Sequence, residues 1–181
     1  VNLTSGADPA VVAAPGDVLR YSLRVENLSD TPLNGFSIVD EIDRLNDSPR
    51  FVPGSLTLVT VPDGADSSAT SPTGGAAGTG LLDIRALNLG PAGEDNGVLL
   101  IEFEAQLARV IPNGSYVTNQ STITFNGITL GISDDPYVNG AAEPAIAGDE
   151  DPTRLTIESA PAFRVEKIST YLDGNPDELL A

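Results

Sequence analysis

The amino-acid sequence predicts an all-β domain, an antiparallel β-sandwich of about nine short strands. Three observations support this fold class. Apolar and polar residues alternate with a period of two in several short segments, as in strands with one face on a core. Val, Ile, Thr, Gly and Pro recur throughout the 181 residues, whereas no segment has a convincing helical period. Hydrophobic residues make up 40% of the chain, which is enough for a folded core.

Turn residues divide the chain into the predicted strands. Pro15-Gly16 precedes the first strand, and Asn126-Gly127 is the strongest hairpin-turn signal. Two segments between strands differ from the rest. Residues 62–80 are low in complexity and are predicted to form a flexible surface loop, and residues 134–151 are acidic and contain Gly and Pro. Strands are predicted at 17–26, 36–39, 51–61, 82–89, 98–110, 116–125, 128–132, 153–158 and 163–170.

The alternation also predicts which side chains face the core. It is strongest over 98–110, where Leu99, Ile101 and Phe103 share one side of the strand. The same argument applied to the other strands gives a core of large apolar residues. The predicted core consists of Leu19, Tyr21, Leu23, Val25, Phe36, Ile38, Leu99, Ile101, Phe103, Leu107, Val117 and Ile123.

The charge and the missing residue types exclude several classes of function. With 9 basic and 26 acidic residues the formal net charge is -17, and a surface this acidic repels nucleic acid and anionic lipid. The sequence contains no Cys and no His, which excludes zinc sites of the Cys/His type and every His-based general base. No stretch approaches the ~20 apolar residues of a membrane span. We therefore expect neither nucleic acid nor membrane insertion, and we do not expect an enzyme.

The two ends of the chain resemble each other. Val1–Thr4 near the start and Val165–Ile168 near the end are both followed by a segment containing Pro. A period of about one domain is what a tandem array would show. We therefore predict a sandwich module over residues 1–159. Residues 160–181 are predicted to be a linker followed by the first strand of a next module, or a strand donated to another copy.

Several short motifs occur in an order that resembles a known family. No single motif is specific, and the order and spacing over roughly residues 10 to 160 carry the resemblance. The motifs are Pro15-Gly16-Asp17-Val18-Leu19-Arg20-Tyr21, Val25-Glu26-Asn27, Val39-Asp40, Val52-Pro53-Gly54-Ser55, the strand Leu99 to Leu107, Gly114, Asn119-Gln120-Ser121, Ser133-Asp134-Asp135-Pro136 and Asp151-Pro152-Thr153. In this order they resemble the conserved-repeat domain, or domain of unknown function eleven, of bacterial and archaeal surface proteins.

The resemblance implies an Ig-like sandwich that is strung in tandem on long secreted proteins. Such proteins are extracellular, lie on the cell surface, and are adhesive or sheath-forming. The family has no established catalytic residues to transfer. The expected function is a structural repeat module or filament subunit whose partners are copies of itself or adjacent modules. The alternative is an adhesin module that binds a glycan or a host-surface ligand through the loop at 62–80.

Acidic residues next to the predicted module boundary are candidate calcium ligands. Calcium takes about six to eight hard oxygen ligands, and carboxylates at a junction could supply several of them. The simpler interpretation is a solvated acidic linker, since no EF-hand spacing is present. The candidate ligands are Asp134, Asp135, Asp149, Glu150 and Asp151.

Apolar residues after the boundary are candidates for contact with a neighbouring module. These are Phe163, Val165 and Ile168. The only lysine, Lys167, lies among them, and an exposed lysine is the ordinary expectation. The alternative is a Lys–Asn isopeptide bond, which would need Lys167 in a core beside a buried carboxylate and an Asn such as Asn119.

Four Asn residues in Asn-X-Ser/Thr sequences near turns are glycosylation candidates. They are Asn2, Asn27, Asn46 and Asn113. A fifth such sequence begins at Asn119, which the alternation places on the inward side of its strand. Turns favour Asn, Ser and Thr in any case, so the simpler interpretation of all five is turn composition.

Overall fold

The computed structural model describes residues 1–160 and 164–169, and in this part of the chain it confirms an all-β fold. The strands are β1 (Val12–Ala13), β2 (Val18–Glu26), β3 (Leu33–Glu41), β4 (Thr57–Thr60), β5 (Leu81–Leu89), β6 (Val98–Gln106), β7 (Tyr116–Asn119), β8 (Thr122–Phe125), β9 (Ile128–Ile132) and β10 (Thr153–Ile157). None of the described residues belongs to a helix long and apolar enough to cross a membrane.

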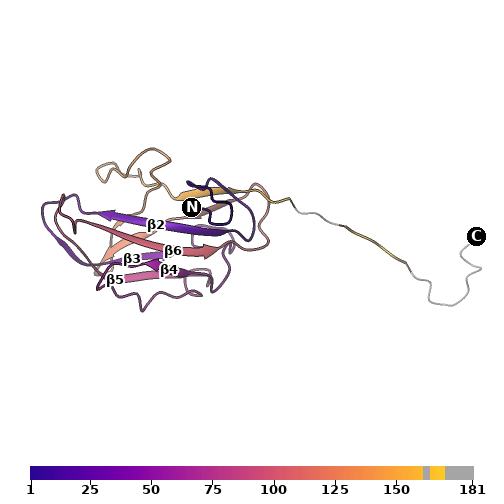
Figure 1. The fold of residues 1–181 in the computed structure, drawn as a ribbon, viewed down its shortest axis with the longest axis horizontal. Coiled ribbons are helices and arrows are strands. Elements are labelled where there is room, and N and C mark those ends of the chain that lie inside the picture. Colours follow the sequence, from indigo (N-terminus) through magenta and orange to yellow (C-terminus); the bar gives the residue numbers. More distant parts are fainter. Residues whose placement is uncertain (161–163, 170–181) are drawn as a thin grey trace, which may run out of the picture.

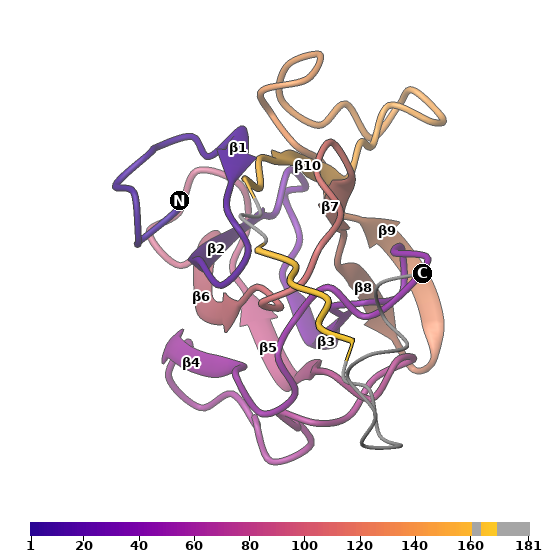
Figure 2. The same ribbon diagram turned by 90° about the vertical axis from the view of Figure 1, so that its right-hand side faces the viewer.

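The strands form three sheets, with the orders β2-β6-β4, β5-β3-β8-β9 and β1-β10-β7. Figure 1 shows the body of the molecule along its length, and Figure 2 shows β2, β6 and β4 on one side with β3, β8 and β9 on the other. The long β2–β6 pair is antiparallel and places Tyr21 opposite Phe103 and Leu23 opposite Ile101. One cluster of buried apolar side chains contains residues of all three sheets, so the sheets enclose a single core, as in a β-sandwich.

One continuous stretch of chain passes from one sheet to another. β7 pairs with β10, whereas β8, after an interruption at Gln120 and Ser121, pairs with β3 and β9. A strand that changes partners in this way needs a local bend, and the residues at the bend leave the regular ladder. The bend therefore places the side chains around Asn119 and Ser121 where two sheets meet.

The predicted core is confirmed, with one systematic difference. Of its twelve side chains, all but four are buried, including Phe36, Ile101 and Phe103. The remaining four pack against the core but are only partly buried. They are Tyr21, Leu23, Val25 and Ile123. Three of these four belong to β2, which lies at the end of its sheet, so part of its inward face lacks a covering neighbour.

The sequence predicted an antiparallel sandwich, and one pair of strands differs from this prediction. β1 pairs with β10 in parallel. Parallel neighbours require a long connection, and here almost the whole module lies between the two strands. The predicted strand at 51–61 is also shorter than expected. Pro53 lacks an N–H and Gly54 has φ of 83°, so Phe51 forms only an isolated bridge to Leu107 before β4 begins.

Residues 62–80 differ from the flexible loop that their composition predicts. Asp66 forms a bridge with Arg85, and Ser71 forms one with Leu81, so the segment lies along β5. At Gly75, φ is 91° and a Cβ atom would lie 2.3 Å from the Gly80 oxygen, which leaves room only for glycine. Residues 62–80 therefore have a defined backbone structure, although their sequence has no hydrophobic pattern, because they pair with β5.

Phe103 provides a test of the core. It is fully buried and stacks on Tyr21 with ring centroids 5.2 Å apart. We expect Phe103→Ala to lower the free energy of unfolding by about 3–5 kcal/mol, because it removes buried aromatic surface and leaves a cavity. Leu100→Ala on the opposite, exposed face of β6 is the control and should cost far less. Equal losses in urea denaturation would contradict the assigned faces of β6.

Candidate functional site

Two inward-facing rows of side chains become polar at the point where they meet. The first row lies on β3 and consists of Phe36, Ile38 and Asp40. The second row lies on β7 and the bend after it, and consists of Val117, Asn119 and Ser121. Alternation places each polar residue on the same side as the apolar residues before it. Asp40, Asn119 and Ser121 are therefore buried together between the sheets; we call them the acid–amide cluster.

Asp40 is the centre of the acid–amide cluster. Its Oδ2 accepts a hydrogen bond from Asn119 Nδ2 at 2.7 Å and another from Ser121 Oγ at 2.6 Å. The remaining oxygens, Asp40 Oδ1 and Asn119 Oδ1, are buried and have no hydrogen-bond partner among the described residues. Both are acceptors, so neither can satisfy the other unless a proton is added. A protonated Asp40 has a hydroxyl that can supply that proton.

The surroundings favour the protonated form of Asp40. Burial raises the pKa of this carboxyl above its ordinary value, and the negative charge of Glu41 adds to the rise. The hydrogen bonds from Ser121 and Asn119 and the positive charge of Arg44 oppose it. Loss of solvent also raises the pKa of Tyr21, which keeps that phenol protonated. The chemistry available here is therefore that of a weak acid next to a carboxamide.

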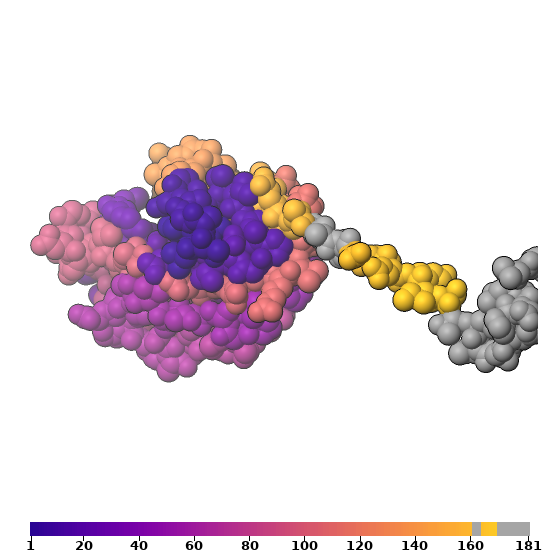
Figure 3. All heavy atoms as spheres, turned by 45° about the vertical axis from the view of Figure 1, so that its right-hand side comes forward, coloured from indigo at the N-terminus to yellow at the C-terminus, as the bar shows by residue number. Residues whose placement is uncertain are grey.

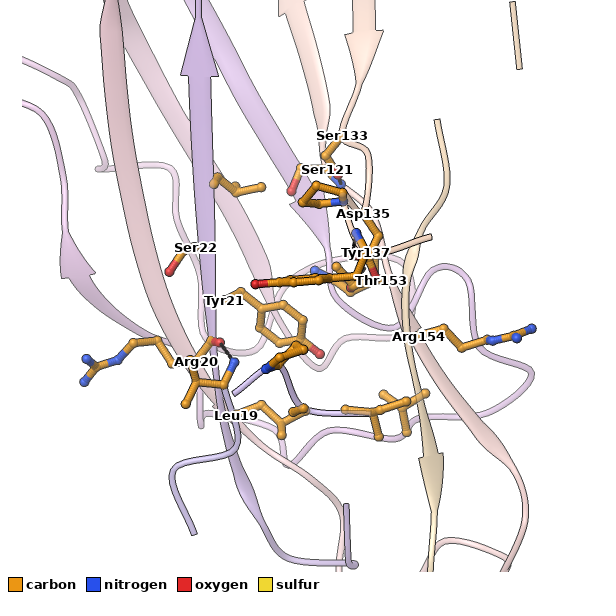
Figure 4. Close-up of a pocket in the computed structure, with 18 of the residues that line it drawn as sticks. Leu19, Arg20, Tyr21, Ser22, Ser121, Ser133, Asp135, Tyr137, Thr153 and Arg154 are labelled. Atoms are coloured by element: carbon orange, nitrogen blue, oxygen red, sulfur yellow. Dashed lines mark hydrogen bonds between the residues drawn. The ribbon is translucent and has the colours of Figure 1, made fainter. Parts of the chain in front are cut away.

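An open pocket of about 400 Å³ leads to the acid–amide cluster. One side is formed by residues 19–23 of β2, and the other by Asn119, Ser121, residues 133–137 and residues 153–155. In Figure 4, Tyr21 projects from β2 into this space, and Tyr137 reaches in from the opposite side. The walls combine apolar side chains with hydroxyl and carboxyl groups, which suits an amphipathic chain segment better than a compact ion.

The strand β2 has a free edge next to this pocket. The backbone groups of Val18 and Arg20 form hydrogen bonds with the backbone of residues 1–3. The backbone groups of Ser22 and Arg24 point the same way and have no backbone partner in the described chain. An unpaired edge of this kind can accept a further strand.

The structure brings the two ends of the acidic segment together. Asp134 Oδ1 accepts a hydrogen bond from the Asp151 N–H at 2.9 Å, and the Asp135 N–H donates to the Asp151 carbonyl at 2.9 Å. Asp149 accepts a hydrogen bond from the Glu143 N–H, and Glu150 contributes its carbonyl to Gln120. In the described ranges no three Asp, Glu, His or Cys side chains are grouped as a metal would require. The calcium site stays a prediction.

The candidate contact residues of the tail can be located only in part. Val165 and Ile168 are 89% and 85% exposed, while Phe163 lies outside the described residues. Lys167 is exposed as well, whereas Asn119, its suggested partner, is buried in the acid–amide cluster. Figure 3 shows residues 164–169 well away from the surface of the body.

Among the glycosylation candidates, Asn113 alone is exposed. Asn2 is buried and donates to Asp17 at 2.7 Å, and Asn27 is buried and donates to the Thr31 and Gly90 carbonyls. Asn46 is partly buried and donates to the Thr118 carbonyl. All four stay predictions, and Asn113 is the one whose amide a modifying enzyme could reach in the folded chain.

Comparison with known proteins does not place the chain in a family. No protein-family model matches it, and neither the curated proteins nor the solved structures contain a significant match.

The pH dependence of stability tests the protonation of Asp40. A raised pKa in the folded state means that its contribution to stability is complete below the ordinary value of 3.8 and is lost as pH rises through the folded-state pKa. In Asp40→Asn the amide oxygen can accept both existing bonds, and the NH₂ group replaces the acid proton without titrating. We therefore expect the variant to gain stability relative to wild type as pH rises above 3.8. The exposed Asp95→Asn is the control, and parallel profiles for Asp40→Asn and wild type would exclude a buried acid.

Melting experiments test the predicted calcium site. An ion that binds only the folded chain raises its melting temperature, so calcium should give a higher value than chelator. Asp134→Asn should reduce this response, because Asp134 Oδ2 is a buried acceptor without a partner in the described chain. Asp63→Asn, at an exposed position, should keep it. Identical melting curves in calcium and in chelator would contradict the prediction.

Proposed function

We propose that this chain is a structural repeat module or subunit of an extracellular surface or filament protein, that it assembles end to end, and that it is not an enzyme. The observation that carries the proposal is the segment 164–169. All six residues are exposed, and they form no strand in the described chain. Val165 and Ile168 are among them, and apolar side chains so placed are stabilised when another surface covers them.

The body of the module offers a complementary surface. The free edge of β2 has unpaired backbone groups, and the inward side chains Tyr21, Leu23 and Val25 are only partly covered. An extended segment from another module or another copy could pair with this edge and cover those side chains, as in donor-strand complementation. A contact between a tail and a body is heterologous, so it propagates into an open array instead of closing.

Composition and sequence resemblance point the same way. The strongly acidic surface disfavours nucleic acid and anionic membranes as partners. The motif order that resembles the conserved-repeat domain of surface proteins supports an Ig-like topology and an extracellular, cell-surface location. The alternative of glycan binding through 62–80 has less support, because that segment contains no aromatic side chain to stack on a sugar.

Removal of the tail tests the proposal. We expect deletion of residues 161–181 to leave the sandwich folded, because its last strand ends at Ile157, and to abolish concentration-dependent association. Sedimentation and negative-stain imaging measure the association, and denaturation measures the fold. Val165→Asp should weaken association in the full chain, whereas the neighbouring Glu166→Gln should not. The proposal fails if the truncated chain associates like the full chain, or if the deletion unfolds the module.

A further inference from the structure

In the acid–amide cluster, a carboxyl group lies next to a carboxamide that a nucleophile could attack. The two residues are Asp40 and Asn119. Asn119 is 5% exposed and Asp40 is 1% exposed, and the Asn119 amide donates to the Asp40 carboxyl at 2.7 Å. Each residue has one further oxygen without a partner in the described chain. A proton on Asp40 Oδ1, directed at Asn119 Oδ1, would satisfy both oxygens at once. It would also draw electrons from the amide carbon and make that carbon more susceptible to attack.

We propose that Asn119 is the acceptor of an intermolecular isopeptide bond, formed with Lys167 from the tail of a second copy and promoted by Asp40. The inference rests on the proposed end-to-end assembly and names the chemistry that would make the joint permanent. Lys167 supplies the only lysine amine in the sequence. The pocket beside the cluster provides the route by which this amine reaches Asn119.

The tail presents Lys167 on the appropriate face. In an extended segment, alternate residues share a side, so Val165 and Lys167 project together. Arg164 and Glu166 lie on the other side, and their 3.0 Å ion pair shows that these two side chains face each other. If Val165 covers the partly buried β2 residues of another copy, Lys167 enters the same interior. Ile168 then faces outward, so Val165 and Lys167 make the inward contact.

The receiving surface can accommodate this face of the tail. A strand added to the free edge at Ser22 and Arg24 would lie beside the pocket that Tyr21 and Leu23 line with Asn119. Burial away from water disfavours the charged form of a lysine side chain. The neutral amine that results is the nucleophilic form.

The reaction balances without any further reagent. Lys167 Nζ attacks Asn119 Cγ, and the Nζ–Cγ bond forms while Asp40 stabilises the negative charge that develops on Oδ1. The Cγ–Nδ2 bond then breaks. The proton lost by the lysine nitrogen passes through Asp40 to the departing nitrogen, and ammonia leaves. Asp40 ends in its initial state, and no atom is oxidised or reduced.

The experiment uses the full chain, incubated at high concentration. We expect a ladder on denaturing electrophoresis, intact masses that fall short of whole multiples of the chain mass by one ammonia per link, and a digest fragment that links Lys167 to Asn119. Lys167→Arg and Asp40→Asn should abolish the ladder while the chains still fold and associate non-covalently. Asn113→Ala, at an exposed position, is the matched control and should keep the ladder.

The possible results separate this inference from the proposed function. Association that dissociates completely in denaturant would overturn the isopeptide bond and leave end-to-end assembly intact. A monomer lighter by one ammonia, or a bond to a different Asn, would overturn the assignment of an intermolecular link to Asn119. Absence of both ladder and association would overturn both. A ladder that persists in Asp40→Asn would remove the role of the acid.

Discussion

The arrangement of the sheets depends on how one buried carboxyl is satisfied. Asp40, near the end of β3, accepts hydrogen bonds from Asn119 and Ser121, which lie on either side of the point where the chain passes from β7 to β8. Loss of one partner of a buried polar group costs about 1–3 kcal/mol or more, so the three residues constrain one another's positions. Because β7 pairs with β10 and β8 pairs with β3 and β9, this contact fixes the relation between two sheets.

The backbone at the bend beside this contact is satisfied by neighbouring residues. A bend between two sheets cannot be closed by regular backbone pairing alone, and other groups must bond to the backbone that the bend exposes. Ser133 accepts a hydrogen bond from the Ser121 N–H through its Oγ and donates its own N–H to the Ser121 carbonyl, and Thr153 Oγ1 donates to the Asn119 carbonyl. The partly covered β2 face lies opposite, so the most polar part of the interior borders the least covered part of the core.

The sequence predicted the fold class and most of the core because these depend on local alternation. It missed Asp40 as an interior residue, although Phe36, Ile38 and Asp40 share one side of β3. The predicted strand stops at residue 39, because the acidic residues that follow are of types that usually lie in solvent. The parallel β1–β10 pair joins segments that are far apart in the sequence. The bridge between Asp66 and Arg85 involves a segment that has no hydrophobic pattern. Neither leaves a local signal in the sequence.

The proposed end-to-end assembly would be weak without a covalent joint. Burial of Val165 contributes about 1.5–3 kcal/mol, whereas association costs about 4–15 kcal/mol in lost freedom of motion. The additional backbone bonds of one short strand contribute about 0.5–1.5 kcal/mol each. Copies with a net charge of -17 also repel each other, most strongly at low salt. A non-covalent joint of the proposed kind would therefore be weak and would depend on salt. A covalent bond formed after docking would hold the proposed array together at low salt and at low protein concentration.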